Sequence, residues 1–441
     1  MKFYNRLQEI EQLHLLSTQA YHGQSTFSLM VGRRRIGKTA LIKETFKSDP
    51  NFMYFFISRK SEALLCEEFL EIIKTKLQIT VLGKVDKLLT LIEFILQQTK
   101  HIPLTIVFDE FQDLEHIDAS LFSGIQNIWD TYKQQNRIHF IVCGSVYSIM
   151  CKLFENNKQP LFGRADTKIT VKPLKIPYLQ QILTDAKQYS NQNLLTVYTI
   201  VGGVPRYLEL LSRQNSWDLE NILDVMLNNN SFFVNEGKDV LIEELGKDYK
   251  TYFSILSLIA SGKTSRSAIE SVLQHSIGGF LDNLENEFSI IKKHKPVFAK
   301  ENSRTQKYSI CDNFLNFWFR YIHKHQSAIE IGNFHYIIDI IKQDFKTYSG
   351  KFLESMIREQ LADSGKYNII GSYWEKNNSN ELDVVACNER HKQLLIAEVK
   401  LQAAKINLGL LQHKSKFLID QYQDYEIKFQ GFSLDDLAII N

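Results

Sequence analysis

The chain has 441 residues, more than a single hydrophobic core usually organises, so we expect about three domains. Hydrophobic residues make up 44% and charged residues 23%, as in ordinary folded proteins, which argues against a largely disordered chain. The 52 basic and 50 acidic residues nearly cancel, so the overall charge neither requires nor excludes nucleic acid as a partner.

Cysteine usage and hydropathy indicate the compartment. The five cysteines are far apart and form no C-x-x-C pair, which is typical of reduced thiols. The first residues, MKFYNRLQEIEQL, are charged and amphipathic, and no apolar run approaches the roughly 18 residues of a membrane span. We therefore expect a cytoplasmic protein with no membrane partner.

The first predicted element is a helix over residues 3–16, where apolar residues recur at spacings of three and four. Its apolar face contains Phe3, Leu7, Ile10, Leu13 and Leu16. Arg6 and Glu9 lie between these positions. Two interpretations stay open: a helix that packs on the following domain, or a Phe-x-x-Arg-x-x-Glu segment that flanks an adenine ring.

An apolar strand over residues 27–31 runs into GRRRIGKT, which fits the motif G-x-x-x-x-G-K-[ST]. In this motif backbone N–H groups surround a phosphate, the lysine reaches the β- and γ-phosphates, and the hydroxyl ligates Mg²⁺. A helix follows, and its positive end would face the phosphates. The predicted nucleotide-binding residues are Gly32, Arg33, Arg34, Arg35, Ile36, Gly37, Lys38, Thr39 and Ala40.

A second apolar strand, over residues 104–110, ends in Asp109 and Glu110. In a Walker B arrangement the first carboxylate holds Mg²⁺ through water and the second polarises the attacking water. An Asp-Glu pair after a strand is also common as a helix cap or in a solvated loop. The upstream phosphate motif favours the catalytic interpretation.

Two further candidates for the phosphate site follow. Ser145 comes directly after an apolar strand at residues 138–144, and it either senses the γ-phosphate or caps the next helix. Arg164 either contacts the γ-phosphate, in its own subunit or across a homo-oligomer, or forms a surface ion pair with Asp166. The alternation of strands and helices predicts a parallel, doubly wound sheet.

Beyond Pro173 the periodicity is helical, with a break at Gly202-Gly203-Val204-Pro205 that is either a lid contact reporting the ATP state or a plain turn. Residues 249–300 then predict short helices followed by a hairpin of Ser289–Lys293 and Val297–Ala299, an order that suits a winged helix. This wing would either contact phosphates or serve protein contacts. Its basic residues are Lys292, Lys293, Lys295, Lys300, Arg304 and Lys307.

Two predicted strands near the end of the chain, at residues 381–386 and 394–400, contain further acids and a lysine. If they pair as a hairpin, Asp383, Glu398 and Lys400 converge, and Glu354 approaches from the preceding helix. Such a group suits Mg²⁺-assisted phosphodiester hydrolysis, with Asp383 and Glu398 as metal ligands and the lysine acting on water. The alternative is two strands with exposed charges.

Taken in order, several segments resemble the archaeal-type ATPases of the AAA-related signal-transduction (STAND) group. They are Arg6 and Glu9, VGRRRIGKT, FDEFQ, CGS, FGRAD, VGGVP and YSICDNFLNFWF. The resemblance implies ATP binding with regulated hydrolysis, a helical lid, a winged helix and a domain similar to the PD-(D/E)xK nucleases. One departure is that Asp383 follows Glu381 and Leu382 rather than a proline.

We therefore expect an α/β protein with four parts. They are a P-loop ATPase domain with a parallel sheet (1–172), a helical lid (173–243), a winged helix (244–332) and a restriction-endonuclease-like α/β domain (333–441). The leading hypothesis is a Mg²⁺- and ATP-driven switch coupled to a DNA-directed metal nuclease. The alternative is a nucleotide-gated regulatory scaffold with a catalytically silent nuclease fold.

Overall fold

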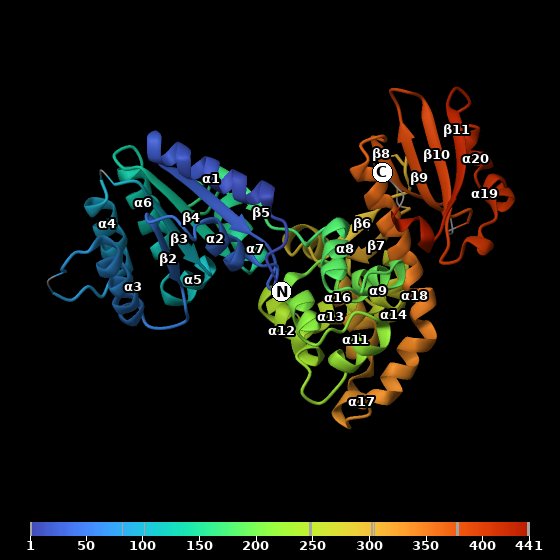
Figure 1. Cartoon of the computed structure of the whole chain (residues 1–441), viewed down its shortest axis with the longest axis horizontal. Coiled ribbons are helices and arrows are strands. Elements are labelled where there is room, and N and C mark those ends of the chain that lie inside the picture. The colour runs from blue at the N-terminus through green and yellow to red at the C-terminus, as the bar shows by residue number, and fades with distance from the viewer. Residues whose placement is uncertain are drawn as a thin grey trace. The chain divides into compact units, whose positions relative to one another are not determined.

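The computed structural model describes residues 2–438 apart from 82, 101, 247–248, 301–302, 304 and 376–378. The chain forms two compact units (Figure 1). One consists of Lys2–Pro173 and Val204–Arg206, and the other of Leu174–Gly203 and Tyr207–Asn441. The first contains the phosphate motif, and the second contains the C-terminal acids.

The first unit is built on a five-stranded sheet in which every strand pair is parallel. In spatial order the strands are β2 (Phe52–Phe56), β3 (Leu104–Asp109), β4 (Ile138–Gly144), β1 (Thr26–Val31) and β5 (Thr167–Thr170). The central strands are buried throughout, which explains their continuous apolar runs. β4 lies between β3 and β1, and all three strands are parallel. The segments that leave their carboxyl ends therefore meet at the same edge of the sheet. The predicted parallel sheet is confirmed.

Helices cover both faces of this sheet (Figure 1). They are α1 (Leu7–His22), α2 (Lys38–Thr45), α3 (Glu62–Leu77), α4 (Leu88–Gln98), α5 (Leu114–Ile117), α6 (Leu121–Tyr132) and α7 (Tyr147–Glu155), with a short 3₁₀ turn at Phe111–Asp113.

The helix predicted over residues 3–16 needs correction, because α1 begins only at Leu7 and both Phe3 and Leu7 are exposed. Leu13 and Leu16 are buried as expected.

The helices that follow are α8 (Ile176–Asp185), α9 (Asn191–Val201), α10 (Pro205–Arg213), α11 (Leu219–Met226) and α12 (Phe233–Leu245), all in the second unit except the first two residues of α10. The predicted break between α9 and α10 is confirmed. Gly202 adopts a φ of +58°, and a Cβ on Gly203 would lie only 1.9 Å from the carbonyl oxygen of Leu174. Both positions therefore require glycine, and Pro205 begins the new helix.

Next come α13 (Tyr249–Ala260), α14 (Arg266–Leu273), α15 (Gly278–Asp282) with a π-helical turn at Asn283–Glu287, and the antiparallel pair β6 (Ile291–His294) and β7 (Lys307–Ile310). The order of helices and hairpin is as expected, but the predicted second strand at residues 297–299 is wrong. The strand that pairs with β6 lies ten residues later. Val297 instead donates its N–H to the carbonyl of Ser372, 2.9 Å away, and so joins the C-terminal sheet.

The chain continues through α16 (Asn313–Phe317), a π-helical turn at Trp318–Ile322, a 3₁₀ turn at His323–His325, α17 (Gln326–Glu330) and the 30-residue α18 (Phe334–Asp363). A mixed sheet follows in the spatial order β11 (Glu426–Phe432), β10 (Gln393–Val399), β9 (Leu382–Asn388), β8 (Ile369–Tyr373). The remaining elements are α19 (Leu408–Lys414), α20 (Lys416–Ile419) and 3₁₀ turns at Ala403–Lys405 and Leu434–Ala438. None of the helices in the described part of the chain has the length and apolarity needed to cross a bilayer.

Candidate functional site

Lys38 lies at the start of α2 with its ammonium inside the P loop. Its Nζ donates to the carbonyl oxygens of Gly32 (2.7 Å) and Arg33 (3.2 Å). Burial lowers the pKa of Lys38, and the negative charges of Glu110 and Asp109 offset only part of this effect. The loop therefore holds a buried cation in contact with backbone dipoles alone, which is an environment suited to an incoming phosphate.

The two predicted Mg²⁺ ligands of this site are in direct contact. Thr39 donates its hydroxyl to Asp109 Oδ2 over 2.6 Å. Tyr54, from β2, donates to the same carboxylate oxygen over 2.6 Å. Hydroxyl and carboxylate oxygens are the donors that Mg²⁺ prefers, so Thr39 and Asp109 fit this ion. Tyr54 was not predicted, because nothing in the sequence of β2 indicates which strand it would face.

Glu110 and Ser145, which leave adjacent strands, are hydrogen-bonded to each other. Ser145 Oγ donates to Glu110 Oε2 over 2.7 Å, and Gln112 Nε2 donates to the same oxygen over 2.7 Å. Burial acts to raise the pKa of Glu110, but these hydrogen bonds and the charge of Lys38 outweigh it and leave the pKa lowered. Glu110 is therefore a carboxylate held in place. Gln112 lies within the FDEFQ segment, although its sequence position gave no indication of this role.

The P-loop backbone has the conformation that the motif requires. Arg35 (φ 70°) and Gly37 (φ 91°) are both left-handed. Arg206, just after the GGVP break, donates its N–H to the carbonyl of Arg35 over 3.4 Å. Arg6 donates a guanidinium N–H to the carbonyl of Ile36 over 3.3 Å, and its other branch pairs with Glu9. The loop is therefore contacted both by the N-cap of α1 and by the segment after the break.

The remaining predicted residues of the loop occupy the same region. Gly32 is so close to the chain after β5 that a Cβ would lie 2.8 Å from the carbonyl of Val171. Arg34 donates its Nε to Ser145 Oγ at 3.5 Å. Arg33 precedes the turn, and Ala40 lies in the first turn of α2.

Arg164 lies away from this site. It donates to Asp130 Oδ2 over 2.9 Å, whereas Asp166 accepts the N–H of Phe27 at the amino end of β1. The predicted ion pair with Asp166 is therefore wrong. The P loop leaves the carboxyl end of β1, roughly 13 Å away along four strand residues. In this conformation Arg164 does not reach a γ-phosphate bound in its own subunit.

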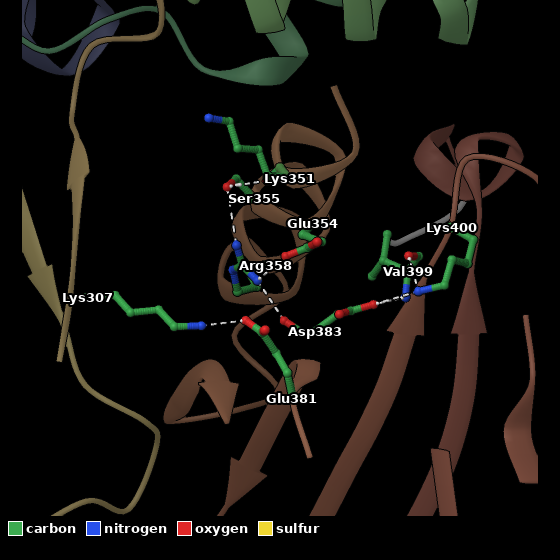
Figure 2. A network of polar contacts seen from close by, with 9 residues as sticks. All are labelled: Lys307, Lys351, Glu354, Ser355, Arg358, Glu381, Asp383, Val399 and Lys400. Atoms are coloured by element: carbon green, nitrogen blue, oxygen red, sulfur yellow. Dashed lines mark hydrogen bonds and ion pairs between the residues drawn. The ribbon is translucent and has the colours of Figure 1, made fainter. Parts of the chain in front are cut away.

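Asp383, Glu398 and Lys400 lie close together, as the strand periodicity predicted, and Figure 2 shows Lys400 directed toward Asp383. β9 and β10 pair antiparallel up to Val384 and Ala397, which places Asp383 beside Glu398. Lys400 Nζ lies 3.4 Å from Asp383 Oδ2 and 3.2 Å from Glu398 Oε1. Burial acts to lower the pKa of Lys400, but these two carboxylates outweigh it and raise the pKa.

Backbone groups orient the two carboxylates. Asp383 Oδ2 accepts the N–H of Val399 over 2.9 Å, and Glu398 Oε2 accepts the N–H of Asn407 over 2.7 Å. Asn407 was not predicted, because it acts through its main chain and its side-chain identity gives no signal. The cluster is thus built by β9, β10 and the start of α19.

Glu354 approaches the cluster from α18. Arg358, one turn later, donates to Glu354 Oε2 (3.4 Å) and to the carbonyl oxygen of Asp383 (2.6 Å) (Figure 2). Burial and the nearby charge of Asp383 raise the pKa of Glu354 to about 7. Arg358 was missed, although its spacing of four from Glu354 on one helix indicated a pair.

The predicted convergence of three carboxylates on one point is not observed. Within the described residues, no three His, Cys, Asp or Glu side chains gather closely enough to hold a metal ion. Asp383 and Glu398 offer suitable oxygen donors, but Lys400 lies against both of them. The arrangement is an ion-paired dyad with a partly buried carboxyl beside it.

Two of the basic residues of the predicted wing form ion pairs. Lys293 pairs with Glu285, and Lys307 pairs with Glu381 at 2.8 Å while lying 4.5 Å above the ring centroid of Trp374. Lys292, Lys295 and Lys300 lie in β6 and the loop after it, and Arg304 is outside the described residues. The wing therefore uses part of its charge in contacts with the C-terminal domain.

The fold and the site define the first unit as a P-loop nucleotide-binding domain, since phosphate loop, acidic pair and polar strand end meet at one edge of a parallel sheet. Residues 3–211 match a family described as an ATPase domain found predominantly in archaea. This part of the chain is therefore similar to archaeal-type ATPase domains, which supports ATP binding by the first unit. Residues 318–411 match a family of archaeal and bacterial proteins of unknown function.

Individual relatives extend this likeness over most of the chain. An uncharacterized protein of Methanocaldococcus jannaschii is 29% identical over 437 residues, covering 94% of this chain and 93% of its own. The Walker-type ATPase PABY2304 of Pyrococcus abyssi is 17% identical with a TM-score of 0.54, covering 72% of this chain and 96% of its own. The ORC2 protein of Aeropyrum pernix, solved in ADPNP and ADP complexes, is 14% identical with a TM-score of 0.48 and coverages of 75% and 95%.

Proposed function

We propose that the protein is a Mg²⁺-dependent ATPase switch whose nucleotide state controls a C-terminal domain that hydrolyses DNA phosphodiesters. The observation that supports it most is the meeting of Asp383, Glu398 and Lys400 in a chain whose first unit is also similar to archaeal-type ATPase domains. Each end of the protein brings acids and a lysine together where a phosphate can be bound. The four proposed domains are the P-loop ATPase domain (1–172), the helical lid (173–243), the winged helix (244–332) and the nuclease-like domain (333–441).

In the ATPase domain, Thr39 and Asp109 would hold Mg²⁺, which neutralises charge on the β- and γ-phosphates. Lys38 would exchange the carbonyls of Gly32 and Arg33 for phosphate oxygens, which restores a full counter-charge to its buried ammonium. Glu110 would orient the attacking water, and this requires the carboxylate to give up part of its bonding to Ser145 and Gln112. Ser145 thus restrains Glu110 until a nucleotide is bound.

The GGVP break would transmit the nucleotide state. Arg206 is hydrogen-bonded to the P-loop carbonyl of Arg35, and it lies in the first turn of α10. A shift of the loop around bound phosphate therefore acts directly on the beginning of that helix. We infer that this helix, with the other helices of residues 173–243, forms the predicted helical lid.

In the C-terminal domain, Asp383 and Glu398 would hold a divalent cation, which stabilises negative charge on the phosphorane. Lys400 would then leave the carboxylates and orient a water molecule. With a pKa of about 7, Glu354 is poised to exchange a proton near neutral pH. Arg358 would keep Glu354 and the start of β9 in place.

The test measures ATP turnover and Mg²⁺- or Mn²⁺-dependent DNA cleavage in wild type, Lys38→Ala and Lys400→Ala. We expect Lys38→Ala to lose both activities and Lys400→Ala to lose cleavage alone. Lys392→Ala is the matched control, because Lys392 is an exposed lysine of the same sheet region that pairs only with Asp424. Metal-dependent cleavage that survives in Lys400→Ala would reject this site.

A second candidate function is a nucleotide-gated regulatory scaffold whose nuclease fold does not cut. The observation that favours it is that Lys400 is paired with both carboxylates, with no third acid in the described residues close enough to complete a metal site. A protein of this kind would turn over ATP and leave DNA intact with every divalent metal tried. Cleavage at a rate that falls in both Asp383→Asn and Glu398→Gln would exclude it.

A further inference from the structure

The hairpin between β6 and β7 is a poor surface for a polyanion, because the chain after β6 packs on the C-terminal sheet. The ring of Phe298 packs against that of Tyr422 with centroids 4.7 Å apart and an interplanar angle of 41°, and the N–H of Val297 donates to the carbonyl of Ser372. Lys307 is already paired with Glu381. These contacts reduce the charge and the area that this hairpin offers to a nucleic-acid partner.

A different stretch offers uncompensated positive charge. Residues 399–419 contain four lysines and one histidine and no acidic residue. Lys405 and Lys416 are exposed, and Lys414 is half-buried. In the described part of the chain, no carboxylate forms an ion pair with any of these three lysines. Their charge is available to a partner.

Apolar side chains lie among these lysines on the outer side of α19 and α20. Leu411 and Leu418 are buried against the sheet, so they define the inner side of this segment. Phe417 is 62% exposed and Leu410 is 45% exposed. Leu410, Lys414 and Phe417 follow the spacing of four and three that places side chains on one helical face. Figure 1 shows α19 and α20 beside β11 and away from β6 and β7.

The same stretch is continuous with the acidic dyad. Lys400, near its start, pairs with both Asp383 and Glu398. Further along, the N–H of Asn407 donates to Glu398 Oε2. A strand lying along this segment would therefore have one of its phosphodiesters near the two carboxylates. The lysines would neutralise its backbone on the way there.

We propose that residues 400–417 form a binding surface for a single-stranded nucleic acid, with Lys405, Lys414 and Lys416 on phosphates and Phe417 stacked on an unpaired base. This rests on the proposed polynucleotide-directed role of the C-terminal domain and names the surface and the substrate form. The exposed aromatic ring favours unpaired bases over a duplex, whose bases are already stacked. With α19 of seven residues and α20 of four, the segment is short for an amphipathic membrane anchor.

The experiment measures binding of the full chain to a fluorescein-labelled 20-mer of deoxythymidine by anisotropy, in EDTA and without ATP. We expect the variant Lys405→Ala/Lys414→Ala/Lys416→Ala to bind at least about tenfold more weakly, with a salt slope smaller by about 2, as expected for three lost phosphate contacts. Phe417→Ala is expected to weaken binding about five- to a hundredfold. ATP turnover of both variants should match wild type.

The matched control is Lys76→Ala/Lys84→Ala/Lys158→Ala, which removes the same charge from exposed positions of the ATPase domain. Its affinity should stay within about twofold of wild type, since non-specific phosphate binding depends on where the charges lie. The proposal would be overturned if the triple variant at Lys405, Lys414 and Lys416 bound the oligonucleotide as tightly as wild type. It would also be overturned if wild type did not bind the oligonucleotide. Tighter lysine-dependent binding to vesicles of phosphatidylserine and phosphatidylcholine would overturn it in favour of a membrane surface.

This measurement is independent of catalysis. Because EDTA removes divalent metal, oligonucleotide binding is measured without cleavage. Lysine-dependent binding with no cleavage in Mg²⁺ or Mn²⁺ would leave this surface standing and remove the nuclease activity of the proposed function. Metal-dependent cleavage, together with oligonucleotide binding that does not depend on the three lysines, would support the nuclease activity and exclude this surface.

Discussion

The two phosphate-directed sites use the same residue types in opposite electrostatic states. In the P loop, Lys38 contacts only backbone carbonyls, and the nearby carboxylates of Asp109 and Glu110 are bonded by hydroxyl and amide groups. In the C-terminal domain, Lys400 is paired directly with both acids. Burial lowers the pKa of Lys38, whereas the two carboxylates, against the effect of burial, raise the pKa of Lys400.

This difference indicates how each site can be activated. The P loop keeps a cation without an ionic partner, so a bound phosphate meets little competition. In the C-terminal dyad one ammonium already offsets part of the charge of two carboxylates, so a metal ion that binds there competes with Lys400. The carboxyl groups differ as well, since the pKa of Glu110 is lowered and that of Glu354 is raised to about 7. One site is prepared for an anion, and the other is closed until its lysine moves.

The largest effect that we expect is the loss of ATP turnover in Glu110→Gln. The amide keeps the shape of the side chain and can still hydrogen-bond Ser145, but it cannot accept a proton from water, so turnover should fall about a hundredfold or more. Nucleotide binding, measured with a fluorescent ATP analogue, should remain. Glu115→Gln, at an exposed position in α5, is the control. Undiminished turnover in Glu110→Gln would show that the acidic pair does not act on water.

Much of the nucleotide site was predictable because its motif combines a strand, a turn and a helix that are close in sequence. The bounds of β4 also follow from the apolar run over residues 138–144. The C-terminal dyad was predictable because strand alternation fixes which side chains share a face. In each case a local pattern determines the relevant geometry.

The errors occurred where distant residues decide the structure. The apolar residues Val297 and Phe298 predicted a strand of the hairpin, but they are apolar because they pack on the C-terminal sheet. Arg164 was placed near phosphate or Asp166, whereas its partner Asp130 lies 34 positions earlier in the chain. Tyr54 and Asn407 were missed because their roles depend on which strand or loop they face.

The second expected effect tests whether a proton controls the C-terminal site. The pKa of Glu354 is about 7 in the folded protein against a normal 4.5. Between pH 4.5 and 7 the native state therefore binds more protons than the unfolded state. The contribution of Glu354 to the free energy of unfolding should therefore be largest below pH 4.5 and fall by up to about 3 kcal/mol as the pH rises to 7. Glu354→Gln should remove this slope, which calorimetry on the full chain can measure.

A suitable control for this slope is Glu330→Gln, because Glu330 is an exposed carboxylate in α17. It should retain the pH dependence of wild type. If Glu354→Gln and wild type changed in parallel between pH 4.5 and 7, Glu354 would be an ordinary ionised carboxylate. The two sites would then not differ in proton control.

A third test replaces Lys38 and Lys400, in separate variants, by methionine, which fills a similar volume without charge. Lys38→Met removes a buried cation that has no ionic partner, so the thermal stability should stay equal or rise. Lys400→Met leaves two facing carboxylates without their cation and should cost about 1–2 kcal/mol, a value reduced because Lys400 is partly exposed. Equal shifts in melting temperature for the two variants would contradict the proposed electrostatic difference.

The smallest expected effect concerns Arg164, which tests whether the P-loop site is complete within one subunit. The side chains of Arg164 and Asp130 are 32% and 33% exposed, so Arg164→Ala should lower stability by less than about 1 kcal/mol. Because Arg164 lies at the amino end of the sheet, any effect on turnover requires a neighbouring subunit. We then expect the specific activity of wild type, but not of Arg164→Ala, to rise with protein concentration.

Mixing Glu110→Gln with Arg164→Ala separates a role of Arg164 in a neighbouring subunit from a role within its own subunit. Glu110→Gln retains Arg164, and Arg164→Ala retains Glu110, so a mixed oligomer contains intact sites only if the arginine reaches across an interface. We expect the mixture to recover part of the wild-type turnover. If Arg164→Ala alone matches wild type at every concentration, the arginine has only its surface pair with Asp130, and the phosphate site does not use it.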